Sequence, residues 1–230
     1  MKESLKSFLK DIFAVVLGIF ITFTVQGMID RSTDRKNVRS SLRLVRSELV
    51  QNIEDITIMK DYIQMEKDAA EYFLAKKDSL EKCPADTFNF YAGMLFADVS
   101  FTLCEDALEL LKMSSVFQKI GNNELSMKII RAYDTCASIL EGLNRHISTR
   151  DAMFENSIDK ETVGDITANG GIELKRFLKT EYGKYSIKWI AVQPYPGSSM
   201  DVADIEEAVA AIDAYLGVRP RKAQNSEDID

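Results

Sequence analysis

The residue types that carry most enzyme chemistry are few in this sequence, and they do not form a known catalytic motif. His146 is the only histidine, and no Gly-x-Ser-x-Gly segment supplies a nucleophile for a Ser-His-Asp triad, so we expect a surface or partly packed histidine. Two carboxylate clusters lie at the starts of expected helices, where exposed amides favour acids: Glu105, Asp106 and Glu109, and Asp204, Glu206 and Glu207. The sequence therefore predicts no catalytic residue, no cofactor and no metal site.

Three cysteines, Cys83, Cys104 and Cys136, lack the C-x-x-C spacing of redox and zinc motifs, and we expect them to be small buried hydrophobic residues. The Asn-Gly-Gly segment 169–171 predicts a turn rather than a phosphate-binding loop, since no Gly-Lys-Ser or Gly-Lys-Thr follows it. The aromatic segment around Trp189 is open to two interpretations, a docking site for a partner or a flap over a helical core.

The elements that would position any function begin with an uncharged segment. Residues 12–29 are eighteen consecutive residues without a formal charge, and as a helix they cover about 27 Å, close to the hydrocarbon thickness of a bilayer. We therefore expect a single-pass anchor with the lipid bilayer as a partner. A cleaved signal peptide is the alternative, because Lys2, Lys6 and Lys10 make a basic start, although no clean A-x-A site follows the apolar run.

Two stripes with four-residue spacing accompany this anchor. Along the uncharged segment, small and hydrogen-bonding residues form an expected membrane packing face: Ala14, Gly18, Thr22 and Gln26. After it, four arginines form a face that is expected to contact lipid headgroups or, alternatively, only solvent: Arg31, Arg35, Arg39 and Arg43. The orientation stays open, because these arginines favour a cytoplasmic domain, whereas a short lysine-bearing N-terminus more commonly stays inside.

A heptad pattern overlaps the end of the arginine stripe, on a segment without glycine or proline from residue 37 to 81. Its core positions are Val38, Val45, Asn52 and Met59, and Leu42, Leu49, Ile56 and Ile63. Asn52, the one polar member, is expected to fix a coiled-coil register. The pattern suits pairing with another chain and equally an antiparallel packing on the chain's own later helices.

The rest of the chain predicts further helices separated by turns. Cys83 and Pro84 are expected to end the long helix. The later elements are a helix opened by a capping box at Thr102 and Glu105, a helix over 124–156, a strand or extended arm over 185–192, and a helix capped by Asp201 that ends at Gly217. The helix over 124–156 is expected to be buried through one face, formed by Leu125, Ile129, Ala132, Cys136, Leu140, Leu143 and Ile147.

One stretch resembles a known group of proteins. Residues 107–115 read Ala-Leu-Glu-Leu-Leu-Lys-Met-Ser-Ser, 121–125 read Gly-Asn-Asn-Glu-Leu, and Ala-Tyr follows at 132–133. With the anchor and the heptad helix before it, this pattern resembles an uncharacterised family of small bacterial single-pass membrane proteins with a helical soluble domain. The chain departs from the family at Val116, where glycine is usual, and at Asp134, where a second tyrosine is usual. The resemblance implies a place in the bacterial inner membrane and adds no chemistry.

The fold class that follows is mainly α, with a transmembrane helix continuing into a long coiled-coil-like helix that packs on a helical bundle. We expect a lead and anchor over 1–30, a juxtamembrane helix over 31–82, a helical domain over 83–220 and a disordered tail over 221–230. A formal net charge of −7, with the basic residues gathered beside the anchor, disfavours nucleic-acid binding. The predicted function is a membrane-anchored interaction protein that binds a second copy or a partner membrane protein. A tethered enzyme or small-ligand domain with a carboxylate and aromatic site is the alternative.

Overall fold

The computed structural model describes the backbone of residues 2–95, 101–155, 171–192 and 200–218, and the side chains of Gln26, 31–95, 101–154, 174–192 and 200–218. Over these ranges the chain is all-α, with eight α-helices, one short 3-10 helix and no strand. The elements are α1 (Lys2–Lys76), η1 (Leu80–Lys82), α2 (Ala85–Leu95), α3 (Asp106–Met113), α4 (Val116–Lys119), α5 (Asn123–Glu155), α7 (Gly171–Lys179), α8 (Glu181–Val192) and α9 (Ala203–Leu216). The expected tail over 221–230 lies outside the described residues.

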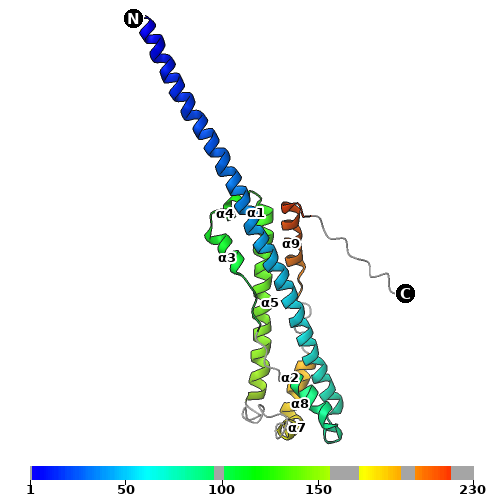
Figure 1. Ribbon diagram of the computed structural model, residues 1–230. Coiled ribbons are helices and arrows are strands. Elements are labelled where there is room, and N and C mark those ends of the chain that lie inside the picture. The colour runs from blue at the N-terminus through cyan, green and yellow to red at the C-terminus, as the bar shows by residue number, and fades with distance from the viewer. Residues whose placement is uncertain (1, 96–100, 156–170, 193–199, 219–230) are drawn as a thin grey trace, which may run out of the picture.

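Helix α1 is the spine of the molecule. Its 75 residues contain no proline, which would remove a backbone hydrogen bond and kink the helix, and they extend for about 110 Å. Figure 1 shows that the N-terminal part of α1 projects well beyond the bundle, whereas α5 and α9 lie beside its middle and α2, α7 and α8 gather at its far end.

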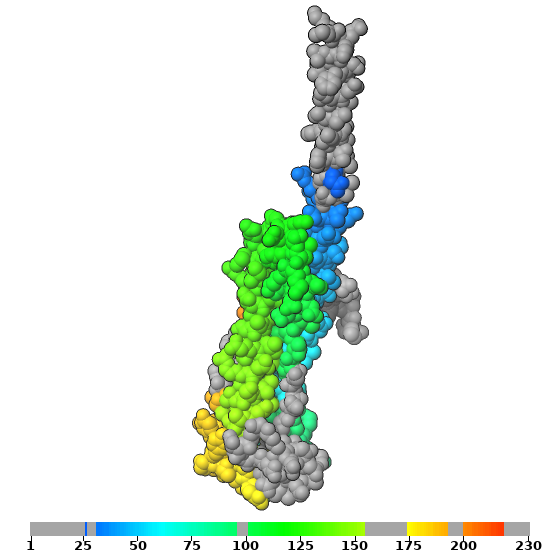
Figure 2. Space-filling model, turned by 90° about the vertical axis from the view of Figure 1, so that its left-hand side faces the viewer, coloured from blue at the N-terminus to red at the C-terminus, as the bar shows by residue number. Residues whose placement is uncertain are grey.

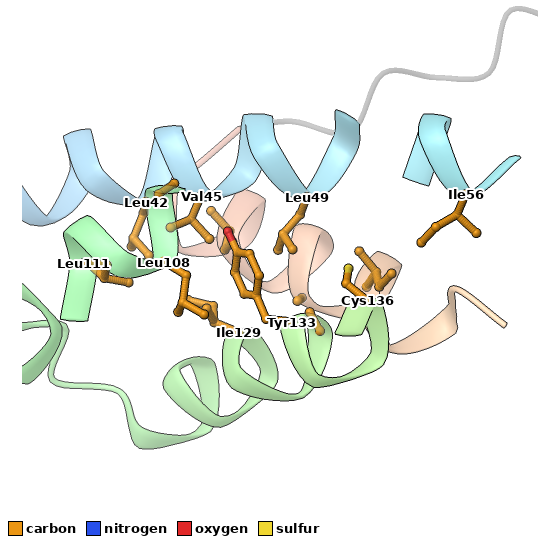
Figure 3. Close-up of a cluster of buried hydrophobic side chains, with 14 of the residues drawn as sticks. Leu42, Val45, Leu49, Ile56, Leu108, Leu111, Ile129, Tyr133 and Cys136 are labelled. Carbon is orange, nitrogen blue, oxygen red and sulfur yellow. The ribbon is translucent and has the colours of Figure 1, made fainter. Parts of the chain in front are cut away.

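The heptad face of α1 is buried inside the chain's own bundle. All eight predicted core residues are at most 9% exposed, Asn52 included. In Figure 3, Leu42, Val45 and Leu49 point towards Leu108 of α3 and towards Ile129 and Tyr133 of α5. Of the two packings that the pattern allowed, the structure therefore has the one within a single chain.

The directions of the helices match the expected antiparallel packing on α1 for α9 and differ from it for α5. Glu48 of α1 contacts Tyr133 of α5, and Glu66, further along α1, contacts His146, further along α5, so these two long helices run parallel. Helix α9 runs against them, since its Asp213 contacts Arg46 of α1 and its Tyr215 contacts Ile120 just before α5. Because α1 and α5 are parallel, the chain must return from the end of α1 to the level where α5 begins. The segment that makes this return includes α2 and α3.

The hydrophobic interior is divided into two clusters. The first lies between residues 38–63 of α1 and helices α3, α5 and α9, and ends on α1 at Ile63. The second begins on α1 at Ala69 and is completed by α2, α7 and α8 around Phe88 and Phe177. Between Ile63 and Ala69 lies Glu66, which is only 1% exposed. A buried charged residue thus marks the junction between the two clusters.

Three local predictions are wrong. Residues 185–192 belong to helix α8 and form no strand, because their buried residues Ser186, Ile187, Ile190 and Ala191 follow helical spacing. Helix α3 begins at Asp106 without a side-chain cap from Thr102 or Glu105; Glu48 of α1 accepts the Ala107 N–H instead, at 2.9 Å. The long helix ends at Lys76, before Cys83 and Pro84, and the 3-10 turn of η1 follows it.

The corner between α7 and α8 depends on a glycine. A Cβ atom on Gly183 would lie 2.1 Å from the carbonyl oxygen of Phe177, a backbone atom that cannot rotate away. The Gly183 N–H also donates to Thr180 Oγ1, which caps the start of α8.

We expect Gly183→Ala to lower the free energy of unfolding by about 1–3 kcal/mol, because the corner must open to admit the methyl group. Gly93→Ala is the matched control, since a Cβ there has open space in helix α2. Thermal unfolding followed by circular dichroism in detergent measures both, and equal midpoints for the two variants would contradict the prediction.

Candidate functional site

Among the described residues, the junction between the two hydrophobic clusters holds the most deeply buried group of charged side chains. Glu66 Oε2 lies 2.7 Å from His146 Nε2, and Glu66 Oε1 lies 3.3 Å from an Arg150 guanidinium nitrogen. The three residues are 1%, 5% and 4% exposed, respectively. A carboxylate removed from water to this extent is stable only when donors replace its hydration, and His146 and Arg150 supply them.

Neighbouring residues complete this junction cluster, which we define as Tyr62, Glu66, His146, Arg150 and Trp189. Arg150 donates to the Tyr62 hydroxyl at 3.3 Å, and from two other nitrogens to Asp151 Oδ1 at 2.9 and 2.8 Å. The His146 ring stacks on Trp189 of α8, with centroids 5.3 Å apart and planes 14° from parallel. Helices α1, α5 and α8 therefore converge on one polar point.

The electrostatics of the junction cluster favour a fixed ion pair. Burial alone would lower the pKa of Arg150, but the attraction of Glu66 and the bond to Asp151 outweigh it, so the pKa rises above its ordinary value. Burial also raises the pKa of Tyr62, against the opposing effect of Arg150. At neutral pH the guanidinium is charged and the phenol is protonated, so Arg150 and Tyr62 keep fixed protonation states between the helices.

A second polar contact ties α3 and α5 to α1 near the other end of the bundle. Tyr133 donates its O–H to Glu48 Oε1 at 2.5 Å, while Glu48 Oε2 accepts the Ala107 N–H. Burial, together with the hydrogen bond to Glu48, raises the pKa of the Tyr133 phenol. One carboxylate thus connects three helices.

Asn52, predicted to fix a coiled-coil register, lies one turn further along α1. Its Nδ2 donates to the Cys104 carbonyl oxygen at 2.8 Å, and its Oδ1 accepts the Cys104 N–H at 2.9 Å. The same Nδ2 lies 3.8 Å from Cys136 Sγ. Both halves of the amide therefore pair with the segment that leads into α3, inside a single chain.

The predicted headgroup stripe is divided by the fold. Arg31, Arg35 and Arg43 are exposed, whereas Arg39 is partly buried and donates to the Leu216 carbonyl oxygen at 2.6 Å, at the C-terminus of α9. Of the membrane packing face, Gln26 has an exposed side chain, and the side chains of Ala14, Gly18 and Thr22 lie outside the described residues. The four arginines therefore do not form one exposed face in the folded chain.

The residues weighed for chemistry are also separated. Glu105, Asp106 and Glu109 are exposed at the start of α3, whereas His146, expected to be a surface or partly packed residue, is buried far along α5. In the described part of the chain, no three residues of the types His, Cys, Asp and Glu are placed to hold a metal ion. An open groove of about 420 Å³ lies between α1 and α9, but its lining includes neither Glu66 nor His146.

The expectation that the cysteines are buried holds for Cys136 alone, and the three differ in exposure. Cys104 is exposed, Cys83 is half-buried, and Cys136 is 3% exposed, with burial raising the pKa of its thiol to about 11. Because the thiolate is the nucleophile, a thiol with this pKa has on the order of a hundredfold less reactive form at neutral pH than an ordinary one, and burial also keeps reagents away from it.

We therefore expect a water-soluble maleimide to label Cys104 first and Cys136 only after unfolding. Peptide mass spectrometry over a time course measures the order, with denatured protein as the control in which all three react. Labelling of Cys136 at the rate of Cys104 in the folded protein would contradict the assigned packing.

Comparison with models of protein families, with curated proteins and with solved structures gives no match for this chain. The resemblance to a family of bacterial single-pass proteins stays a prediction. Within the described residues, no helix has the length and apolarity that crossing a bilayer requires. The side chains of the uncharged run 12–29, Gln26 apart, lie outside that description.

The contact between Glu66 and Arg150 was not predicted from the sequence, although both residues lie at core positions of their helices. Glu66 lies seven residues after Met59 and so occupies the next core position of the α1 heptad. On α5 the buried residues Ile139, Leu143, His146 and Arg150 follow the same spacing, whereas the predicted Leu140 and Ile147 are only partly buried. Opposite charges at core positions of two helices predict a buried pair.

Proposed function

We propose that this chain is a membrane-anchored helical interaction protein, in which the uncharged run 12–29 crosses a bilayer and the bundle is held at its surface. The observation that carries this proposal is the continuity of α1, since the run and the spine of the bundle belong to one helix from Lys2 to Lys76. Whatever holds the first part of that helix in lipid also fixes the bundle beside the membrane.

The proposed partner is a second copy or another membrane protein, bound through the face of Ala14, Gly18, Thr22 and Gln26. The heptad face of α1 is occupied by α3, α5 and α9, which supports placing association in the membrane segment. A tethered enzyme is less well supported, because a substrate of the Glu66 and His146 pair would have to separate helices that leave these residues at most 5% exposed.

Carbonate extraction of membranes containing the full chain tests the anchor. The chain should stay in the membrane pellet at its full mass of 26.0 kDa. Release of the intact chain into the carbonate wash would overturn the proposal, and a shortened soluble product would establish cleavage of the N-terminal segment instead.

Cross-linking in the same membranes tests association. We expect Gly18→Ile to reduce the dimer band, because a bulky residue prevents close approach of two helices. Val15→Leu, a change outside the four-residue stripe, should leave the band unchanged. Equal dimer yields for Gly18→Ile and the unmodified chain would place the contact elsewhere.

A further inference from the structure

The end of the bundle nearest the uncharged run is strongly basic. Residues 31–46 contain six basic residues and one acidic residue, and 110–123, which span the end of α3 and all of α4, contain two lysines and no acidic residue. The whole chain has a net charge of −7, so positive charge is concentrated at this end. We define the basic end as the exposed residues Arg31, Arg35, Lys36, Lys112 and Lys119.

Helix α4 is fixed close to the expected bilayer boundary. Lys119 Nζ lies 2.7 Å from Asp34 Oδ1 of α1. Asp34 follows the last residue of the uncharged run by five positions, which is about 7 Å along the helix axis. The headgroup layer extends about 5–7 Å beyond the hydrocarbon on each side of a bilayer. Lys119 therefore lies at the level where headgroups end.

Apolar side chains accompany the lysines on this surface. Leu110 and Met113, three residues apart on one face of α3, are 61% and 82% exposed, and Lys112 lies between them in the sequence. Figure 2 shows the green surface of α3 to α5 directly beside the blue surface where α1 enters the bundle. Exposed apolar residues mixed with lysines are typical of surfaces that bind the interface of an anionic membrane.

We propose that the basic end and the Leu110 and Met113 surface dock on anionic headgroups of the bilayer that holds α1, an inference that rests on the proposed anchoring. Each basic side chain near such a surface adds to the attraction, and the apolar pair enters the interface as the bundle leans towards α3. Two attachments then fix the bundle, the helix through the bilayer and the surface of α3 and α4 lying against it.

A tryptophan placed at position 113 tests the docking. The full chain carrying Met113→Trp is reconstituted into vesicles of phosphatidylcholine and phosphatidylglycerol that contain a lipid with a headgroup nitroxide quencher. Ile58→Trp is the matched control, because Ile58 is 60% exposed and lies about 40 Å beyond the uncharged run along α1. The native Trp189 contributes the same background to both.

In anionic vesicles at low salt, we expect the quencher to remove the emission of the tryptophan added by Met113→Trp. The emission of the tryptophan added by Ile58→Trp should be unchanged. Adding Lys112→Glu should lower the ratio of docked to undocked protein by about fivefold or more, and 1 M salt should also release the surface. Lys77→Glu, the same charge change just past the far end of α1, should have no effect.

Equal quenching at positions 113 and 58 would overturn the docking. Quenching at position 113 that is unchanged by both 1 M salt and Lys112→Glu would also overturn it. Carbonate extraction of the same vesicles tests separately whether the chain is anchored in the bilayer. A chain that stays in the membrane without quenching at position 113 keeps the anchor and refutes the docking, whereas a chain released by carbonate refutes both.

Discussion

Replacing Glu66 with glutamine should lower the free energy of unfolding by about 3–5 kcal/mol. The carboxylate is 1% exposed and contacts both His146 and Arg150. Without its charge, the buried Arg150 guanidinium loses the attraction of Glu66, while its bond to Asp151 lies at the edge of the site, where half of the Asp151 side chain is exposed. Breaking a buried ion pair costs far more than breaking an exposed one.

Urea unfolding in detergent measures this loss, with circular dichroism for the helices and Trp189 emission for the junction, since Trp189 stacks on His146. Glu71→Gln is the control, because Glu71 is exposed on the same helix and should change stability by less than about 0.5 kcal/mol. The double variant Glu66→Met with Arg150→Met should be more stable than Glu66→Met alone, because it removes the buried charge that the single change leaves behind. Equal stability of the Glu66→Gln and Glu71→Gln variants would show that the buried pair contributes nothing.

Replacing Asn52 with leucine should destabilise the bundle by about 2–4 kcal/mol, and the sign of the effect distinguishes two folds. In a coiled coil between chains, a core asparagine reduces stability, so leucine would raise it. In this bundle, leucine leaves the N–H and C=O of Cys104 without the partners that Asn52 supplies.

The control for this change is Met59→Leu at the next equivalent heptad position, which is also fully buried and conserves volume. It should cost less than about 1.5 kcal/mol. Hydrogen exchange at the Cys104 amide gives a local measurement, and we expect faster exchange in Asn52→Leu only. A higher urea midpoint for Asn52→Leu would contradict the single-chain packing.

The heptad of α1 was predictable because one face of a regular helix faced a continuous core. Each of its core positions, from Val38 to Ile63, is buried as the spacing indicates. The partner of that face was not predictable from spacing alone, since helices of the same chain and of another chain bury the same residues. The parallel direction of α5 depends on the long return through α2 and α3, which no local pattern of α1 contains.

Short elements were harder to predict, because tertiary contacts outweigh local signals in them. The start of α3 is set by Glu48 on a distant helix rather than by Thr102, and α8 has only 12 residues, too few for alternating and helical spacing to be told apart. The junction cluster was missed because the heptad of α1 was ended at Ile63, one step before Glu66.

The uninterrupted course of α1 has a mechanical consequence. A helix without proline bends gently and resists twisting, and the residues that bind α5 and α9 are on the same rod that begins at Lys2. A rotation of its first turns about the helix axis would therefore be transmitted as torque along α1. Helices α5 and α9, which pack on it, would rotate with it.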